Sequence, residues 1–170
     1  MSPQKNMRKI AKAAFTYTEQ FPDNQPHSLL FYGDPGTGKT FLCDCIAKKL
    51  LDQGFTVLYL TANALCSALD EFRFHRNPSM QEKAQLIHDQ LGEVDLLIVD
   101  DLGTEFASQI TMGDLFECFN QRILKSKATI ISTNLKPEQL RTTYMDRLYS
   151  RFNGYYQFYE FYGPDLRTIK

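Results

Sequence analysis

The segment of this 170-residue chain with the clearest chemistry is Gly33-Asp34-Pro35-Gly36-Thr37-Gly38-Lys39-Thr40. It matches the phosphate-binding pattern G-x-x-x-x-G-K-[ST] at every fixed position, between an apolar run and a helical pattern. Glycines let successive backbone N–H groups turn inward and form an anion nest at the positive end of the following helix. We expect Lys39 to reach the β- and γ-phosphates and Thr40 to hold Mg²⁺. The segment, with Phe41 beside it, predicts a nucleoside triphosphate site, and the alternative is a glycine-rich turn before a helix.

Two carboxylates and an amide follow apolar runs further along the chain. Asp100 ends the run Leu96-Leu97-Ile98-Val99 and is the candidate for the Mg²⁺ shell. Asp101 is suited to orienting the attacking water. Asn134, at the tip of the next apolar run, could sense the γ-phosphate or fix that water. Strand ends also carry Asp and Asn for ordinary turn reasons, so these assignments depend on the phosphate loop being intact.

Two arginines lie on one predicted helical face near the end of the chain. Arg147 and Arg151 are four residues apart in the segment Asp146–Phe152. An arginine supplied by a neighbouring subunit can stabilise the charge that develops during phosphoryl transfer. The alternative is a surface helix with ordinary ion pairs.

The elements that must position these residues alternate between strand and helix. Expected strands cover 28–32, 55–60, 94–99, 128–132 and 155–161. Expected helices cover 1–20, 39–53, 61–74, 79–91 and 112–124, with short helices over 137–152. Continuous apolar strands between helices predict an α/β fold with a parallel sheet covered on both faces. Because ligands bind at the carboxyl ends of such strands, Gly33, Asp100 and Asn134 should share one edge.

Composition favours one packed domain. The chain is 43% hydrophobic and 13% aromatic, which argues against intrinsic disorder. A net charge of −1 supplies no nucleic-acid footprint by itself. No apolar stretch is long enough for a membrane helix, so we expect a cytoplasmic protein without a membrane partner. We interpret the basic side of the first helix, which carries Lys5, Arg8, Lys9 and Lys12, as a solvated face.

Four segments in order resemble a known family. They are Gly33–Thr40, Leu96–Gly103, Ile131–Leu135 and Asp146–Phe152. Together they are similar to the AAA+ ATPase domain of bacterial replicative helicase loaders, the DnaC and DnaI proteins, to which the transposition ATPase IstB is also similar. The resemblance runs from about residue 28 to the end. On this resemblance we expect an N-terminal helix and linker (1–27) and an AAA+ domain (28–170), and we expect the amino-terminal helicase-binding region of loaders to be absent.

The resemblance implies a three-layer αβα P-loop NTPase of the AAA+/RecA-like type, with a mainly parallel five-stranded sheet. It further implies ATP and Mg²⁺ as cofactors, assembly with other copies through the ATP sites, and binding to single-stranded DNA and a replicative hexameric helicase. Carried over by motif, the resemblance assigns phosphate and metal contact to Lys39 and Thr40, and the role of second-motif acids to Asp100 and Asp101. Asn134 would be the sensor, and Arg167 a second sensor. Arg151 would be the trans-acting arginine, with Arg147 as second choice.

One departure from the wider AAA+ pattern bears on turnover. Most members have Glu after the second-motif Asp, whereas this chain has Asp101, one methylene shorter, as loaders do. We therefore expect weak hydrolysis that depends on assembly or DNA. Two alternatives remain: a nucleotide-gated DNA-binding module with negligible turnover, and an IstB-like transposition helper. A small-molecule kinase would need a lid of several arginines, which the pattern fits poorly.

The segment Phe72-Arg73-Phe74-His75-Arg76 predicts a DNA contact. It interleaves aromatic and cationic groups, which can stack bases and follow a phosphate backbone, and Phe72, Arg73 and Arg76 are the candidates. In loaders and initiators a DNA-facing helix is inserted at this place. The alternative is a core Phe72 with solvated arginines. The aromatic run over 155–162 is expected to be structural.

Overall fold

The computed structural model describes residues 2–23, 28–74, 78–105 and 108–168. The strands are β1 (Ser28–Gly33), β2 (Val57–Thr61), β3 (Leu96–Leu102), β4 (Ala128–Thr133) and β5 (Tyr156–Phe161). The helices are α1 (Pro3–Gln20), α2 (Lys39–Asp52), α3 (Ala62–Phe74), α4 (Pro78–Leu91), α5 (Gln109–Leu124) and α6 (Pro137–Tyr155), followed by the 3₁₀ turn η1 (Leu166–Thr168).

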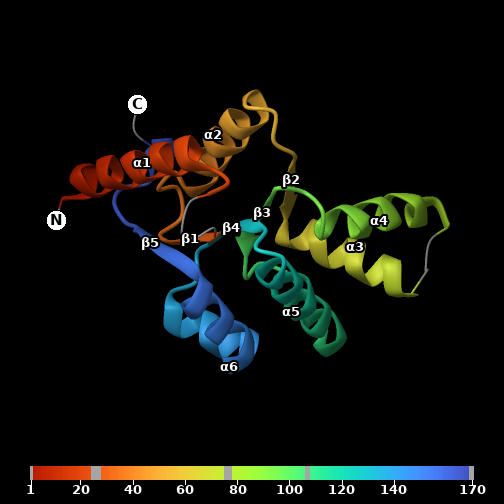
Figure 1. Ribbon diagram of the computed structural model, residues 1–170. Helices are drawn as coiled ribbons and strands as arrows, with labels where there is room; N and C mark the ends of the chain where they lie inside the picture. The colour runs from red at the N-terminus through yellow and green to blue at the C-terminus, as the bar shows by residue number, and fades with distance from the viewer. Residues whose placement is uncertain (1, 24–27, 75–77, 106–107, 169–170) are drawn as a thin grey trace.

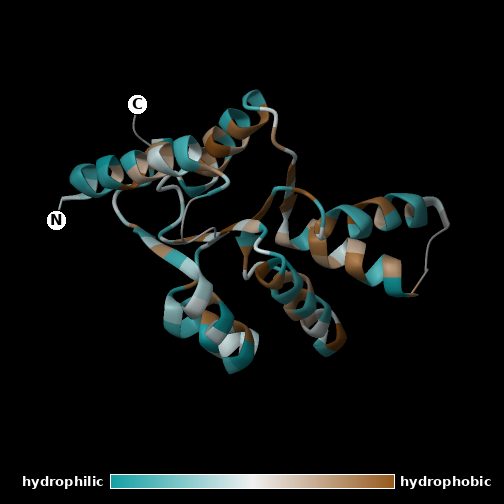
Figure 2. Ribbon diagram, viewed as in Figure 1, coloured by the Kyte–Doolittle hydropathy of each residue, from teal (hydrophilic) through white to brown (hydrophobic). Residues whose placement is uncertain are grey.

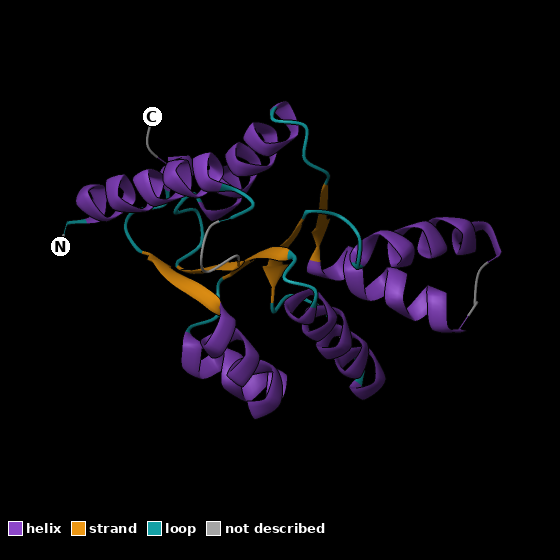
Figure 3. Cartoon of the chain, in the orientation of Figure 1, coloured by secondary structure: helices purple, strands orange, loops and turns teal. Residues whose placement is uncertain are grey.

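The five strands form one sheet in the order β2-β3-β4-β1-β5. Every pair of neighbouring strands is parallel, so the carboxyl ends of all five lie at the same edge (Figure 3). This confirms the predicted α/β fold. In this order only β4 separates β1 from β3, so the phosphate loop after β1 and the acidic end of β3 lie at the same edge.

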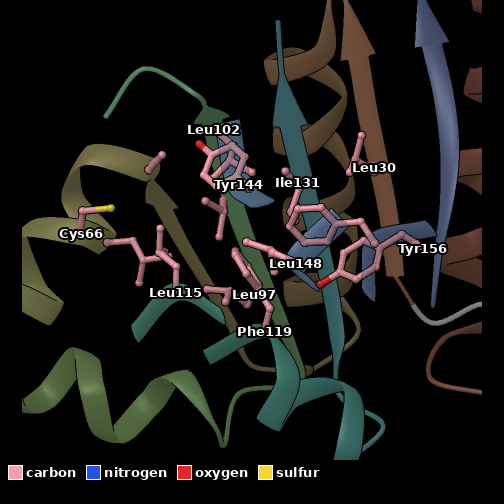
Figure 4. Close-up of a cluster of buried hydrophobic side chains, with 14 of the residues drawn as sticks. Leu30, Cys66, Leu97, Leu102, Leu115, Phe119, Ile131, Tyr144, Leu148 and Tyr156 are labelled. Carbon is pink, nitrogen blue, oxygen red and sulfur yellow. The ribbon is translucent and has the colours of Figure 1, made fainter. Parts of the chain in front are cut away.

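Helices cover both faces of the sheet, as the continuous apolar strands predict. Helices α1 and α2 lie on one face and α5 and α6 on the other, while α3 and α4 project beyond β2 (Figure 1). Because successive strand residues face opposite sides, β3 sends Leu97 into one core and Leu96 and Ile98 into the other. On the α5 and α6 face, Leu97 and Phe119 point toward the same interior (Figure 4). The helices carry their hydrophilic residues on the sides that face away from the sheet (Figure 2).

Helix α1 is part of the same packed body as the sheet. Its side chains Ile10, Ala14 and Tyr17 are buried in the core beneath α1 and α2. The side-chain amide of Asn6 donates to the backbone oxygen of Glu160 at 2.6 Å, which fixes α1 against β5. No helix in the described part of the chain is long and apolar enough to cross a bilayer.

Helix α6 corrects the expectation of several short helices over 137–152. The structure has a single helix that continues to Tyr155. Leu140, Tyr144, Leu148 and Phe152 are buried at a spacing of four residues, so one face packs on the core along most of the helix. This packing carries the helix through Gly154, a residue that by itself favours a break.

A buried arginine joins α5 to the amino-terminal edge of the sheet. The side chain of Arg122 is 1% exposed, and burial lowers the pKa of its guanidinium. Its Nε donates to Thr129 Oγ1 at 2.9 Å. Its terminal nitrogens donate to the backbone oxygens of Leu91, Val94 and Ala128. One side chain therefore binds the ends of three segments at the edge opposite the phosphate loop.

Candidate active site

The phosphate loop connects β1 directly to α2. Gly33, Gly36 and Gly38 have φ values of 127°, 71° and 98°, in a region that residues with a side chain rarely adopt. A Cβ added at Gly33 would also come 1.9 Å from the backbone oxygen of Phe161 on β5. Thr37 Oγ1 donates to the Asp34 backbone oxygen at 2.7 Å and closes the turn. The glycines are therefore required both by the turn and by close packing against β5.

Lys39 begins α2 with its ammonium group folded into the loop. The side chain is 5% exposed, and Nζ donates to the backbone oxygens of Gly33 and Asp34, both at 2.8 Å. Burial lowers the pKa of Lys39, while the nearby carboxylates of Asp101 and Asp34 oppose that shift. The cation is thus held next to the loop that would surround the phosphates.

The carboxylate of Asp100 on β3 accepts hydrogen bonds from side chains of three other elements. Thr40 on α2 donates through Oγ1 to Asp100 Oδ1 at 3.2 Å. The phenol of Tyr59 on β2 donates to Oδ2 at 3.2 Å, and Ser132 Oγ on β4 donates to Oδ1. Hydroxyl and carboxylate oxygens are the ligands that Mg²⁺ prefers, so Thr40 and Asp100 fit a Mg²⁺ site.

Tyr59 and Ser132 were not identified in the sequence as site residues. A polar residue directly after Ile130-Ile131 was an available signal for Ser132. No local signal marked Tyr59, because its contact depends on β2 lying beside β3.

Asp101 enters the site through an irregularity in β3. The register of β3 against β4 shifts between Val99 and Leu102, and Asp101 has a φ of 57°. Its backbone N–H donates to Ser132 Oγ at 3.0 Å. In a regular strand, two successive side chains point to opposite faces. The shift instead allows Asp101 to line the same pocket as Lys39. Burial, followed by repulsion from Asp100, raises the pKa of Asp101.

A cavity of about 600 Å³ lies beside these side chains, and its lining includes Asp101 but not Asp100. Its lining comes from the phosphate loop, the ends of β3 and β4, and the last turn of the described chain: Pro35, Gly36, Gly38, Lys39, Thr40, Phe41, Asp101, Asn134, Leu166 and Arg167. Asn134 and Phe41 are exposed to this cavity. A larger cavity of about 800 Å³ lies between α3, α4 and α5, and its lining includes no phosphate-loop residue.

The segment Asp165–Thr168 lies over the phosphate loop. The backbone N–H of Leu166 donates to the Gly36 oxygen at 2.8 Å. A Cβ added at Gly36 would come 2.0 Å from the Asp165 carboxylate, so this acid lies directly against the loop. Arg167 donates through Nε and Nη2 to Asp165, at 2.9 and 2.6 Å. This pairing lowers the pKa of Asp165 to about 2.

The Asp165–Arg167 pair predicts opposite effects of its two partners on ATP affinity. In Arg167→Ala an uncompensated carboxylate remains next to the phosphate-binding loop, and we expect the Kd for a fluorescent ATP analogue to rise about fivefold. In Asp165→Asn the oxygen that accepts from the Arg167 N–H is retained and the negative charge is removed, so the Kd should fall a few-fold. A tighter Kd in Arg167→Ala would contradict this account.

The other predicted site residues lie away from this cavity. Arg151 lies half-buried on α6 and is not part of the cavity lining of its own chain. The guanidinium carbon of Arg147 lies 4.9 Å from the centroid of the Phe116 ring, so this arginine packs against α5. The trans-acting role of Arg151, with Arg147 as second choice, stays a prediction.

The predicted DNA contact on α3 is engaged within the chain. The ring of Phe72 stacks on His88 of α4, with centroids 3.6 Å apart and planes within 6°. Arg73 pairs with Asp114 of α5 through two nitrogens, with Nε to Oδ2 at 2.8 Å. Arg76 lies outside the described residues. The side chain of Arg73 is nevertheless 50% exposed, and the nucleic-acid contact through Phe72 and Arg73 stays a prediction.

Comparison with known families identifies the family over most of the chain. The model of the bacterial DnaA ATPase domain matches residues 4–156. The replicative helicase loader DnaC of Escherichia coli K12 is 33% identical over 146 residues, which cover 85% of this chain and 57% of that protein. The chain therefore spans little more than half the length of that relative.

Solved structures share the same fold. A crystal structure of the DnaC helicase loader superposes with a TM-score of 0.77 at 18% identity, covering 90% of this chain and 88% of that one. A replication initiator DnaA, bound to AMPPCP and single-stranded DNA, superposes with a TM-score of 0.70 at 26% identity, covering 87% of this chain and 45% of that one. The five-stranded parallel sheet matches the AAA+ P-loop architecture of these proteins.

Proposed function

The chain belongs to the AAA+ ATPase family of bacterial replication initiators and helicase loaders, and on that premise we propose that it is the ATPase domain of a helicase loader. In this proposal the domain binds and hydrolyses ATP in the cytoplasm, binds single-stranded DNA and contacts a replicative hexameric helicase. Identity to a loader over 85% of the chain supports the loader setting. An initiator structure that holds single-stranded DNA supports the DNA contact.

The observation that carries the ATPase proposal is the Thr40–Asp100 hydrogen bond. It joins the metal-binding hydroxyl of the phosphate loop to the second-motif acid, two residues 60 positions apart. Bound ATP with Mg²⁺ would supply the phosphoanhydride bond that is cleaved. Lys39 would offset charge on the phosphate oxygens, and Asn134 and Asp101 would orient the attacking water.

Completion of this site by a second subunit predicts an ATPase rate per molecule that rises with protein concentration. Arg151→Ala should reduce hydrolysis about a hundredfold or more, since a trans-acting arginine carries much of the charge stabilisation.

Mixing Arg151→Ala with Lys39→Ala should restore part of the rate, because the Arg151→Ala subunit keeps an intact phosphate loop and the Lys39→Ala subunit keeps its arginine. Arg147→Ala is the matched control on the same helix. A mixture that stays inactive would contradict the trans assignment.

A nucleotide gate with negligible turnover is the second candidate, favoured by Asp101. Its side chain is short, and its raised pKa reflects an environment that disfavours a second charge beside Asp100. Single-stranded DNA affinity measured with ATP, ADP and the Lys39→Ala variant separates the two functions. A gate requires affinity to follow the bound nucleotide even when no hydrolysis is detected.

The loader function itself is tested by binding to the replicative helicase of the same cell. We expect a complex that forms with ATP and weakens with ADP, measured by size-exclusion chromatography with light scattering. Binding to DNA and a transposase, with no binding to the helicase, would instead identify an IstB-like transposition helper.

A further inference from the structure

Helix α1 carries a stripe of cations that the ATP site does not use. Lys5, Arg8, Lys9 and Lys12 are spaced by three and four residues, so they share one face of the helix. All four are exposed. The stripe extends over about 10 Å along the helix axis, the rise of about three stacked nucleotides. Four positive charges are thus concentrated on one short surface of a chain whose net charge is −1.

The cations of this stripe have no acidic partners among the residues that the structure describes. The acid of α1, Glu19, lies beyond the stripe and pairs with Lys49 of α2 at 3.3 Å. Several basic residues elsewhere do pair within the chain: Lys48 with Asp52, Arg73 with Asp114, Lys125 with Glu93 and Arg141 with Asp146.

The stripe is held on a rigid base and has an aromatic ring at its end. Core packing on the opposite face of α1 and the Asn6 hydrogen bond to β5 hold the helix in place. Phe15, three residues after Lys12, is 62% exposed. Cations that follow a phosphate backbone, with an exposed ring on which a base can stack, are the two parts of a single-strand binding surface.

We propose that the stripe of α1, with Phe15, is a docking surface for single-stranded nucleic acid. The proposal deepens the DNA contact of the proposed loader function and rests on it. A membrane surface is a poorer fit, because an interfacial helix needs an apolar face available for lipid and that face of α1 is buried in the core. An exposed ring favours a single strand over a duplex, whose bases are already stacked.

The face of α1 opposite the stripe lies close to the phosphate loop. A Cβ added at Gly38 in the phosphate loop would come 3.6 Å from the methyl group of Met7 on α1. Met7 lies nearly opposite the stripe around the helix, so a strand bound along the stripe would be separated from the phosphate loop by α1 itself. The DNA surface and the nucleotide site share one helix, so occupancy of one can alter the other through α1.

The test replaces all four cations with glutamine, a good helix former, and measures affinity for a fluorescent single-stranded oligonucleotide by anisotropy over a series of salt concentrations. We expect the affinity to fall tenfold or more at about 0.1 M salt. The slope of log K against log salt should become shallower by about 0.7 per cation removed, up to about 2.8. Phe15→Ala should weaken single-strand binding about tenfold and leave duplex binding nearly unchanged.

A control variant removes the same charge elsewhere: Lys48→Gln, Lys49→Gln, Lys83→Gln and Lys125→Gln combined. An equal loss in this control would show a bulk charge effect and overturn the proposal. Unchanged affinity in the α1 variant, with DNA binding by the wild type intact, would overturn it while the loader function stands. Absence of single-strand binding by the wild type would overturn both the α1 proposal and the DNA contact of the loader. Melting temperatures of both variants check that the fold is retained.

Discussion

Lys39→Ala should abolish ATP hydrolysis, with a loss of at least about a hundredfold, or roughly 3 kcal/mol of transition-state stabilisation. The Lys39 ammonium is the cation that the phosphate loop itself encloses, held by the Gly33 and Asp34 oxygens. Its removal leaves the developing charge on the γ-phosphate without its nearest compensation inside the chain. We expect ATP affinity to fall as well, because the ground-state phosphates lose the same contact.

The measurement is steady-state phosphate release at saturating ATP, together with the Kd of a fluorescent ATP analogue. Lys48→Ala is the matched control, because Lys48 lies on the same helix, is exposed and pairs only with Asp52 among the described residues. The melting temperature of Lys39→Ala should stay close to that of the wild type, since the loop oxygens that lose a donor can bind water. Near wild-type hydrolysis in this variant would contradict the assignment of the site.

Arg122→Leu should lower the free energy of unfolding by about 3–5 kcal/mol. The guanidinium supplies hydrogen bonds to the Leu91, Val94 and Ala128 oxygens and to Thr129, and nearly all of it is buried. Leucine provides no donor, so these acceptors remain desolvated and unpaired. Such a loss is a large part of the stability of an ordinary domain.

Urea unfolding followed by circular dichroism measures this change. Lys125→Ala, one helical turn further on and exposed beside Glu93, is the matched control and should cost less than about 1 kcal/mol. Arg122→Lys keeps the charge but not the planar fork of donors, so it should fall between the two. A loss below about 1 kcal/mol in Arg122→Leu would show that the acceptors find other partners.

Much of the fold was predictable because its signals are local. Continuous apolar runs such as Leu96–Val99 and Ala128–Ser132 indicate strands buried on both faces, and these strands lie side by side in the parallel sheet. The sequence predicted the length of α6 less accurately, as several short helices rather than one. A glycine near its end suggests a break, whereas burial of Leu148 and Phe152 on the core keeps the helix continuous.

Part of the candidate site could also be assigned from sequence. Lys39 and Thr40 were identified by spacing alone, since the loop and the helix start that position them are contiguous in the chain. Asn134 and Asp101 were identified as strand-end residues and line one cavity in the structure. Their catalytic roles remain predictions.

The sequence alone therefore determined the phosphate loop, the order of strands and helices, and the family. Only the tertiary structure decided the contacts around Asp100 and the position of Asp165 over Gly36. It also decided that Arg73 pairs with Asp114, whereas the cations of α1 form no ion pair with any described residue. The physical reason is that a turn or an apolar run depends on neighbouring residues. A hydrogen bond between distant residues depends on strand order, register and the irregularity at Asp101, which packing of the whole chain selects.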